Sequence, residues 1–133
     1  MTRFVVDAGV VIRLARERAE VPSQHELLAP TLLRSQVLSS LHEAVDRGEL
    51  TAEEGRELLE RTSAIKIRLL GDLVLRRNGW RYADELGEAT TYDAEYVALT
   101  RLQGDVFVTL DRGLAARAGK VVAIAPFDDL LQG

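Results

Sequence analysis

The chain has 133 residues, of which 47% are hydrophobic and 29% charged, a composition typical of one folded globular domain rather than a disordered segment. It contains no cysteine, which excludes a disulfide framework, a thiol nucleophile and a cysteine zinc site. It has only two histidines, which argues against a histidine-rich metal site. The formal net charge of −4 argues against a general polyanion binder, although it allows a local basic rim around an acidic pocket. We therefore treat residues 1–133 as a single domain.

Strand-like and helix-like segments alternate along this domain. Apolar strand patterns are clearest in RFVVD and DVFVTLD, and Thr51 with Glu54 three residues later forms a capping-box pattern that begins a helix. The predicted elements, in chain order, are a strand at 3–7, a helix at 9–18, a connector with two prolines at 21–31, helices at 31–47 and 51–63, a strand at 64–69, helices at 70–86 and 90–103, a strand at 105–111, a helix at 112–119 and a strand at 120–126. The pair Asn78-Gly79 is a potential interruption of the helix at 70–86, and Gly48 and Gly104 are helix stops.

This alternation predicts an α/β fold, with parallel strands joined by crossover helices in a three-layer α/β/α sandwich around a mostly parallel sheet. The amino-terminal residues MTRFVVDAGVVI are interrupted by Asp7 and lack a small-residue cleavage site, so we expect no signal peptide. No run approaches the roughly 18 apolar residues of a membrane-spanning helix. The expected location is the cytoplasm, without membrane contact.

Three aspartates occupy positions where such a fold binds ligands. Asp7 ends the first strand, Asp111 ends the strand at 105–111, and Asp93 lies in the first turn of the helix at 90–103. Ligands of open α/β sheets bind beyond the carboxyl ends of the strands, so the three carboxylates would meet at one edge. Packed like charges repel and raise each other's pKa, which a divalent cation among them would relieve. Oxygen ligands without sulfur or imidazole favour Mg²⁺ or Mn²⁺.

Each aspartate also has a structural interpretation. Asp7 could cap the helix that begins near Gly9, and Asp111 could cap the one that begins near Arg112. Asp93 could simply interact favourably with the dipole of its own helix. The convergence of all three would distinguish a site from three helix caps, and topology alone does not prove it.

The segments FVVDAGVVIRL, TTYDAEYVALTRLQ and DVFVTLDRGLAARAG, in this order, resemble the PIN-domain ribonucleases and, more narrowly, the VapC toxins of bacterial toxin–antitoxin pairs. The resemblance covers nearly the whole chain. It implies a PIN-like fold and a Mg²⁺-dependent endoribonuclease that cuts structured RNA, often tRNA or ribosomal RNA. It also implies a cognate VapB antitoxin that blocks the site, and a homodimer.

On this resemblance the first, third and fourth acids of the family fall on Asp7, Asp93 and Asp111, and Thr109 matches a recurrent polar position, although a strand threonine is more often structural. The second acid falls on Gln36, in PTLLRSQVLSSL, so one carboxylate is missing. Gln36 lies on the apolar stripe of its helix and interrupts it. The stripe consists of Leu32, Leu33, Val37 and Leu41.

The implied roles follow from the residue types. Asp7 and Asp93 would ligate Mg²⁺ directly, and Asp111 would hold a second metal or orient water. Gln36 can accept a hydrogen bond from such water through its carbonyl oxygen, but it supplies no charge and cannot act as a base. Glu43, two turns further along the same side of the helix, either touches the pocket through water or is a solvated charge, which is the commoner case.

Other residues are weaker candidates. Glu95 points to another side of its helix than Asp93 and reaches the pocket rim at most. Trp80 and Tyr82 could stack on RNA bases beside several arginines, while core or dimer packing is the commoner use of a tryptophan. A solvated helix face is the commoner role of most arginines. The arginines considered are Arg13, Arg16, Arg18, Arg68, Arg76, Arg77 and Arg81.

Three other functions compete with the nuclease. A PIN-like module that binds RNA or antitoxin with weak or no cleavage would follow from the missing acid at Gln36. A phosphohydrolase with Asp7 as nucleophile usually needs a second aspartate two residues later, where this chain has Gly9. A nucleotide-binding module is disfavoured because no glycine-rich phosphate loop follows the first strand.

Overall fold

The computed structural model describes every residue from Met1 to Gly133. Its elements, in chain order, are β1 (Arg3–Val6), α1 (Ala8–Glu17), β2 (Glu26–Pro30), α2 (Leu32–Asp46), α3 (Ala52–Ala64), β3 (Arg68–Leu70), α4 (Leu73–Leu86), α5 (Tyr92–Leu102), β4 (Val106–Val108), α6 (Arg112–Ala118) and the 3-10 helix η1 (Phe127–Leu131). The strands form one sheet in the order β3-β2-β1-β4, and every neighbouring pair is parallel. The predicted α/β sandwich with a parallel sheet is confirmed.

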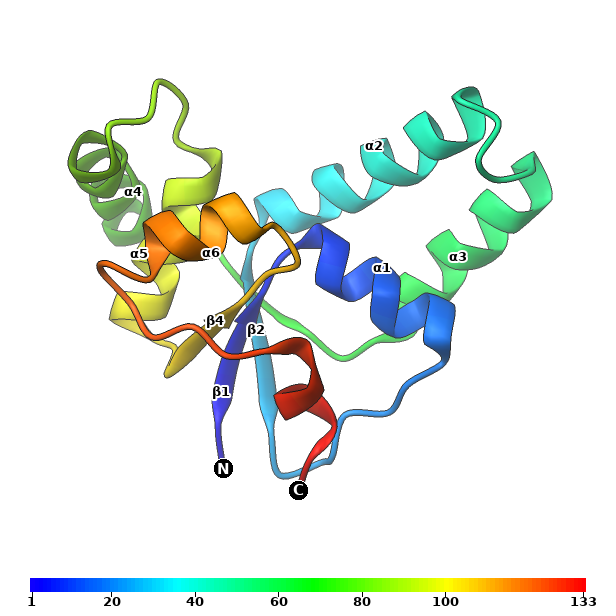
Figure 1. Ribbon diagram of the computed structural model, residues 1–133, viewed down its shortest axis with the longest axis horizontal. Helices are drawn as coiled ribbons and strands as arrows, with labels where there is room; N and C mark the ends of the chain where they lie inside the picture. The colour runs from blue at the N-terminus through cyan, green and yellow to red at the C-terminus, as the bar shows by residue number, and fades with distance from the viewer.

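The helices lie in two layers, with α1, α2 and α3 on one side of the sheet and α4, α5 and α6 on the other (Figure 1). The direction of the chain explains this division. The crossovers from β1 to β2 and from β2 to β3 move one way across the sheet, whereas the chain returns to the opposite side of β1 to form β4. Because parallel crossovers are right-handed, reversing the direction places the later helices on the opposite face.

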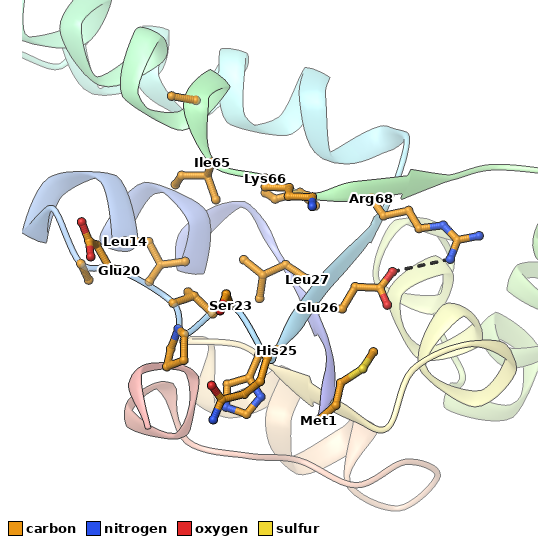
Figure 2. Close-up of a pocket in the computed structure, with 16 residues that line it drawn as sticks. Met1, Leu14, Glu20, Ser23, His25, Glu26, Leu27, Ile65, Lys66 and Arg68 are labelled. Carbon is orange, nitrogen blue, oxygen red and sulfur yellow. Dashed lines mark ion pairs between the residues drawn. The ribbon is translucent and has the colours of Figure 1, made fainter. Parts of the chain in front are cut away.

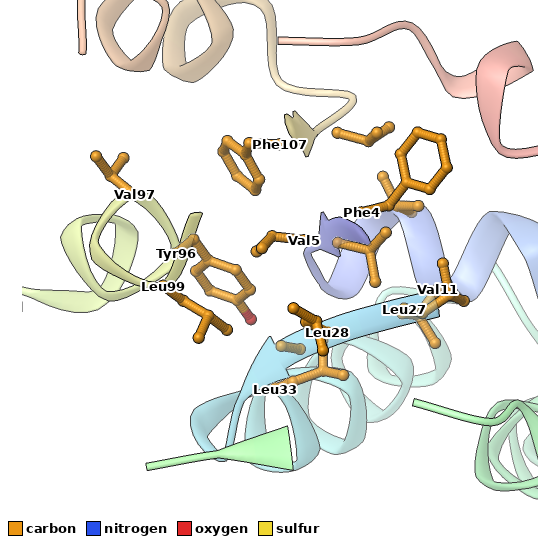
Figure 3. Packing of buried hydrophobic residues seen from close by; sticks show 14 of the residues in the cluster. Phe4, Val5, Val11, Leu27, Leu28, Leu33, Tyr96, Val97, Leu99 and Phe107 are labelled. Carbon is orange, nitrogen blue, oxygen red and sulfur yellow. The ribbon is translucent and has the colours of Figure 1, made fainter. Parts of the chain in front are cut away.

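The core fills the space between these layers. Helix α5 rests directly on β1, β2 and β4, and α4 packs against its outer side. Figure 3 shows the aromatic rings of Tyr96 and Phe107 beside the aliphatic side chains of the central strands, and the two ring centroids are 5.9 Å apart. Both residues are almost completely buried, as are Val5 and Leu28. Burial of such side chains is the main source of the stability of the fold.

Two glycines end helices at the predicted positions. Gly48, after α2, has a φ of 77°, the left-handed conformation that favours glycine. Gly104, after α5, lies so close to β1 that an added Cβ would be 2.7 Å from Cγ2 of Val5. The chain can therefore pass from α5 into β4 only without a side chain at position 104.

The most consequential difference from the sequence prediction is β2, which lies in the segment taken as a connector. Two prolines suggested that no strand was present, but Pro22 precedes the strand and Pro30 occupies its last position. The remaining residues pair with β1 on one side and β3 on the other, and three of them are buried. Tertiary packing therefore overrides the local signal for a loop.

Other boundaries also shifted. β3 is shorter and later than the predicted strand at 64–69, and α4 begins at Leu73, where the Asp72 side chain caps it by accepting a hydrogen bond from the Leu75 amide at 2.8 Å. Helix α4 continues through Asn78-Gly79 without a break, and the absence of a side chain at Gly79 makes room for Glu95 of α5. The strand predicted at 105–111 is reduced to Val106–Val108.

The strand predicted at 120–126 is wrong except for one residue pair. Ile124 forms an isolated parallel bridge with Phe107, with the Phe107 amide donating to Ala123 and the Ala125 amide donating back to Phe107. The following residues turn into η1 instead of extending the sheet. No helix of the protein is both long enough and apolar enough to cross a bilayer.

Candidate active site

The carboxyl ends of β1 and β4 meet where the strand order changes direction. From β1 the chain passes to β2 on one side, while β4 reaches the other side of β1 only after the whole of α5. Open parallel sheets bind ligands at such a switch point. Asp7 follows β1, and Thr109 and Asp111 follow β4, so the predicted meeting of strand ends places these three residues at one edge.

Asp7 is both a helix cap and a member of the site. Its Oδ1 accepts a hydrogen bond from the Val10 amide at 3.2 Å, which caps α1, and its Oδ2 accepts a short hydrogen bond from the Thr109 hydroxyl. Burial raises the pKa of Asp7 above its ordinary value, the two hydrogen bonds oppose this, and the charges of Asp93 and Asp111 raise the pKa further. The three aspartates are therefore electrostatically linked.

A cavity of about 280 Å³ opens beside Asp7. Its polar wall contains Asp7 and Asp93, together with Gln36 from α2 and Tyr96 from α5. Its other lining residues are Ala8, Gly9, Ser39, Ser40 and Glu43. Of the residues considered from the sequence, the structure thus brings Asp7, Asp93 and Gln36 to this cavity, and Tyr96 is a lining residue that sequence reasoning did not identify.

Glu43 also borders this cavity, and its side chain is exposed, as the favoured interpretation of a solvated charge predicted. One of its oxygens accepts a hydrogen bond from the Ser39 hydroxyl at 3.3 Å, and the other lies 3.8 Å from Arg47. The two-turn spacing from Gln36 thus keeps Glu43 in the lining of the same pocket. These contacts are solvent-exposed and individually weak.

Asp111 lies next to the cavity rather than in its wall. Its carboxylate caps α6 by accepting a hydrogen bond from the Leu114 amide at 3.0 Å, and its own amide donates to the Thr109 hydroxyl at 3.2 Å. Thr109 therefore connects Asp111 to Asp7. The sequence interpretation of Thr109 as a strand residue missed this bridging position, which comes one residue after β4 ends.

Asp93 is paired with an arginine that sequence reasoning did not select. Arg117 of α6 lies with its Nη2 3.6 Å from Asp93 and donates from Nε to Glu88 at 2.9 Å. Burial is the largest influence on the pKa of Asp93 and raises it; Glu88 and Asp111 also raise it, and Arg117 lowers it. Arg117 thus favours the ionised form of Asp93.

Gln36 is held by a buried tyrosine. The Tyr96 hydroxyl donates to Oε1 of Gln36 at 2.6 Å. Burial, followed by the charges of Asp7, Glu95 and Asp93, raises the pKa of Tyr96, so its hydroxyl stays protonated and remains a donor. The amide oxygen that was expected to serve pocket water is therefore directed to Tyr96.

Comparison with known proteins identifies the family. No family model matches the chain. The chain is 31% identical over 126 residues to Ribonuclease VapC3 from Pyrobaculum aerophilum, an alignment that covers 86% of this chain and 94% of that relative. The chain belongs to the VapC ribonuclease family. The resemblance to PIN-domain VapC proteins noted in the sequence is thereby confirmed.

Solved structures support the same fold for this VapC family member. The crystal structure of PAE2754 from Pyrobaculum aerophilum superposes with a TM-score of 0.73 at 27% identity, covering 98% of this chain and 93% of the other. A structure of VapBC-1 from nontypeable Haemophilus influenzae gives a TM-score of 0.63 at 12% identity, with 95% and 98% covered. At that identity the second likeness concerns the fold alone.

The donor set of this VapC family member fits one hard cation bound partly by water. No three acidic or imidazole side chains converge closely enough to hold an ion together. Asp7 and Asp93 nevertheless face the same cavity and offer only oxygen atoms. Mg²⁺ keeps several of its waters and is commonly bound through one or two carboxylates, so these two residues suffice as its protein ligands.

A larger cavity, of about 860 Å³, lies elsewhere. It opens at the amino ends of the strands, between the loop before β2 and the loop before β3, and Figure 2 shows Met1, His25, Lys66 and other residues around it. None of the aspartates of the candidate site lines it. Glu26 and Arg68 in its wall pair with each other at 3.5 Å.

The residues proposed for RNA contacts separate into distinct environments. Tyr82 is buried, which excludes base stacking by its ring, whereas Trp80 is 70% exposed, which excludes core packing. Four of the seven arginines considered are engaged in surface ion pairs with glutamates. These are Arg13, Arg18, Arg68 and Arg81. The interpretation of most arginines as a solvated helix face fits these pairs.

Proposed function

We propose that this protein is a Mg²⁺-dependent endoribonuclease, also active with Mn²⁺, that acts in the cytoplasm as the toxin of a VapBC pair and cleaves structured RNA such as tRNA or ribosomal RNA. The supporting observation is the pocket in which Asp7 and Asp93, from elements far apart in the sequence, face one cavity at the switch point of the sheet. Membership of the VapC ribonuclease family supports the same chemistry.

The chain's own residues would divide the work as follows. When bound, a divalent cation acidifies a water molecule and neutralises charge on the phosphate. Asp7 and Asp93 would hold that cation, with Asp7 fixed in orientation by Thr109 and the start of α1. Asp111 would add negative potential from behind this pair, and Arg117 would keep Asp93 ionised.

A second function follows from Gln36. With an amide where the family pattern has an acid, the pocket holds one negative charge fewer than that pattern implies. A PIN-like module that binds RNA or an antitoxin with weak cleavage is therefore the alternative. Both functions share the VapB-type antitoxin as partner, which would block the acidic pocket.

The decisive experiment incubates the purified protein with total RNA and Mg²⁺, with and without EDTA, beside Asp7→Asn. Discrete fragments that disappear with EDTA and in the variant are expected for the nuclease. RNA that is retained on the protein but stays intact in Mg²⁺ would instead establish the binding module.

Self-association is the remaining part of the proposal. Several large apolar side chains are exposed on α4 and at the start of α5, and Trp80 is the most exposed among them. These residues are Leu73, Val74, Trp80 and Tyr92. Aromatic residues are enriched in protein interfaces, so we assign this face to contact with a second copy of the chain.

We expect Trp80→Ser to weaken the dimer by at least about 2 kcal/mol, which corresponds to roughly 30-fold, because an exposed tryptophan at the centre of an interface is a typical hot spot. Light scattering coupled to size-exclusion chromatography over a concentration series measures this. Leu102→Ser, which removes a 41% exposed leucine from the end of α5, is the matched control. If both variants and the wild type dissociate at the same concentration, α4 is not part of the interface.

Arg117→Gln should make metal binding more sensitive to acid. Arg117 lowers the pKa of Asp93, so its loss raises that pKa further and leaves more of the carboxylate protonated in mild acid. We expect Mn²⁺ affinity at pH 5.5 to fall on the order of tenfold, the usual cost of losing a partner of a metal ligand, and to change less at pH 8. Calorimetric titration with Mn²⁺ at both pH values tests this, with Arg101→Gln as control. Parallel pH profiles for the two variants would contradict it.

A further inference from the structure

The orientation of the Gln36 amide has a chemical consequence. A glutamine side chain presents an acceptor oxygen on one side and a two-proton donor nitrogen on the other. The Tyr96 hydroxyl donates to Oε1 of Gln36 at 2.6 Å, and this is the only hydrogen bond of either side chain. The oxygen is therefore committed to Tyr96, and Nε2 is left to face elsewhere.

Nε2 of Gln36 faces open space. No protein acceptor receives a hydrogen bond from it, yet the structure contains no buried side-chain nitrogen or oxygen without a partner. Nε2 must therefore be accessible, and the open space that half-buried Gln36 borders is the cavity it shares with Asp7 and Asp93. A donor in this position suits an acceptor atom and disfavours a cation.

We infer that Tyr96 is a positioning residue which turns Gln36 so that its amide nitrogen donates to a phosphate oxygen of the RNA, and that Gln36 is not a ligand of the metal. This inference rests on the proposed phosphodiester substrate. In the family pattern, an acid at this position would help to hold the cation. Here the neutral amide of Gln36 donates a hydrogen bond to the phosphate instead.

The surroundings of Tyr96 give it the rigidity that this role requires. Its side chain is almost fully buried, and its ring stacks on Phe107 of β4. Figure 3 shows the ring extending from α5 toward β2, with the hydroxyl oxygen directed to the side of Leu28. The reverse orientation, with Nε2 donating to Tyr96, would leave the tyrosine proton without the acceptor it now has.

The test uses two binding measurements that do not depend on cleavage. The first is calorimetric titration of the RNA-free protein with MnCl₂ alone. The second is fluorescence anisotropy with a short 2′-O-methyl RNA in EDTA. The variants are Gln36→Met, which keeps the length of the side chain without its polar atoms, and Tyr96→Phe, which removes only the hydroxyl. Tyr82→Phe removes the hydroxyl of another buried tyrosine, on α4 and outside the pocket, and is the control.

We expect Gln36→Met to weaken RNA binding by at least about tenfold, as for loss of one hydrogen bond to a charged group, and to leave Mn²⁺ affinity within about twofold of wild type. Tyr96→Phe should also weaken RNA binding, and should shift the side-chain amide resonances of Gln36 in ¹H–¹⁵N spectra. Tyr82→Phe should change neither. These resonances are assigned by their loss in Gln36→Met.

Two results would overturn the inference. If Gln36→Met weakens Mn²⁺ binding as much as Asp93→Asn does, the oxygen of Gln36 faces the metal. If Tyr96→Phe leaves both RNA affinity and the Gln36 resonances unchanged, Tyr96 positions nothing. A wild-type protein that binds Mn²⁺ and RNA but does not cleave would contradict the proposed nuclease while leaving these tests valid.

Discussion

Asp7→Asn should abolish measurable RNA cleavage while leaving the fold intact. Asp7 lines the pocket, and the Thr109 hydroxyl and the Val10 amide at the start of α1 both donate hydrogen bonds to it. Asparagine keeps the shape and one oxygen but loses the charge that would hold a cation. We expect the cleavage rate to fall at least about 100-fold, since losing even an outer partner of a metal ligand costs up to that much. A fluorescent RNA cleavage assay measures the loss.

The same variant should be no less stable than the wild type at neutral pH. Folding raises the pKa of Asp7 above its ordinary value of 3.8, so protonation of Asp7 favours the folded state. That contribution is fully present below the unfolded pKa and is lost as the pH rises through the folded pKa. At pH 7 the wild type thus carries a buried charge that asparagine lacks, and asparagine caps helices as well as aspartate does.

Thermal melts from pH 4 to pH 8 test this pair of effects. The melting temperature of Asp7→Asn should equal or exceed that of wild type at pH 7, and the difference should shrink toward pH 4. Asp72→Asn is the control, because Asp72 caps α4 in the same way but lies outside the pocket. A melting temperature of Asp7→Asn more than about 4 °C below that of wild type at pH 7 corresponds to roughly 1 kcal/mol for a domain of this size. It would mean that Asp7 contributes mainly to the stability of the fold.

Gln36→Glu should tighten metal binding and increase cleavage. Tyr96 can donate to one carboxylate oxygen as it now donates to Oε1, which leaves the second oxygen where Nε2 borders the cavity. A third carboxylate would then line the metal-binding side of the pocket with Asp7 and Asp93. We expect Mg²⁺ affinity and the cleavage rate at saturating RNA to rise about tenfold to 100-fold. RNA binding itself should weaken because the Nε2 donor is lost, and the protein without metal should lose some stability because like charges repel.

Calorimetry with Mg²⁺ and single-turnover cleavage separate binding from chemistry in this variant. Gln103→Glu adds the same charge at the exposed end of α5 and should change neither quantity. If Gln36→Glu leaves both the affinity and the rate at wild-type values, residue 36 does not face the metal site, and the placement of α2 against the pocket must be revised.

The sequence predicted the parts of the site that follow directly from strand ends. Asp7 and Asp111 could be found because each comes just after an apolar strand, and Asp93 because it begins a helix. Arg117 could not be found, since its role depends on the tertiary packing that brings the end of α6 to the first turn of α5. Tyr96 was hidden for another reason, because an aromatic residue on a buried helix face gives no sign of where its hydroxyl points.

The fold was predictable where local pattern and tertiary packing agree. The alternation of apolar strands and helices was sufficient for the parallel sandwich, and the Thr51 capping box forms as expected. The pattern failed to predict β2, because its sequence ELLAP is short and ends in a proline. The pattern also failed at 120–126, where an apolar run was predicted to be a strand. Only Ile124 forms a β-bridge there, and the chain then turns into η1.

The hydrogen bond between Thr109 and Asp7 spans 102 positions of the chain. Neither the pocket wall supplied by α5 nor the support supplied by β4 exists until most of the polypeptide has been synthesised. Any amino-terminal fragment released or stalled before that point carries Asp7 without its partners. The candidate site is therefore completed only by residues from the last quarter of the chain, and a fragment that ends before β4 lacks Thr109, Asp111 and Arg117.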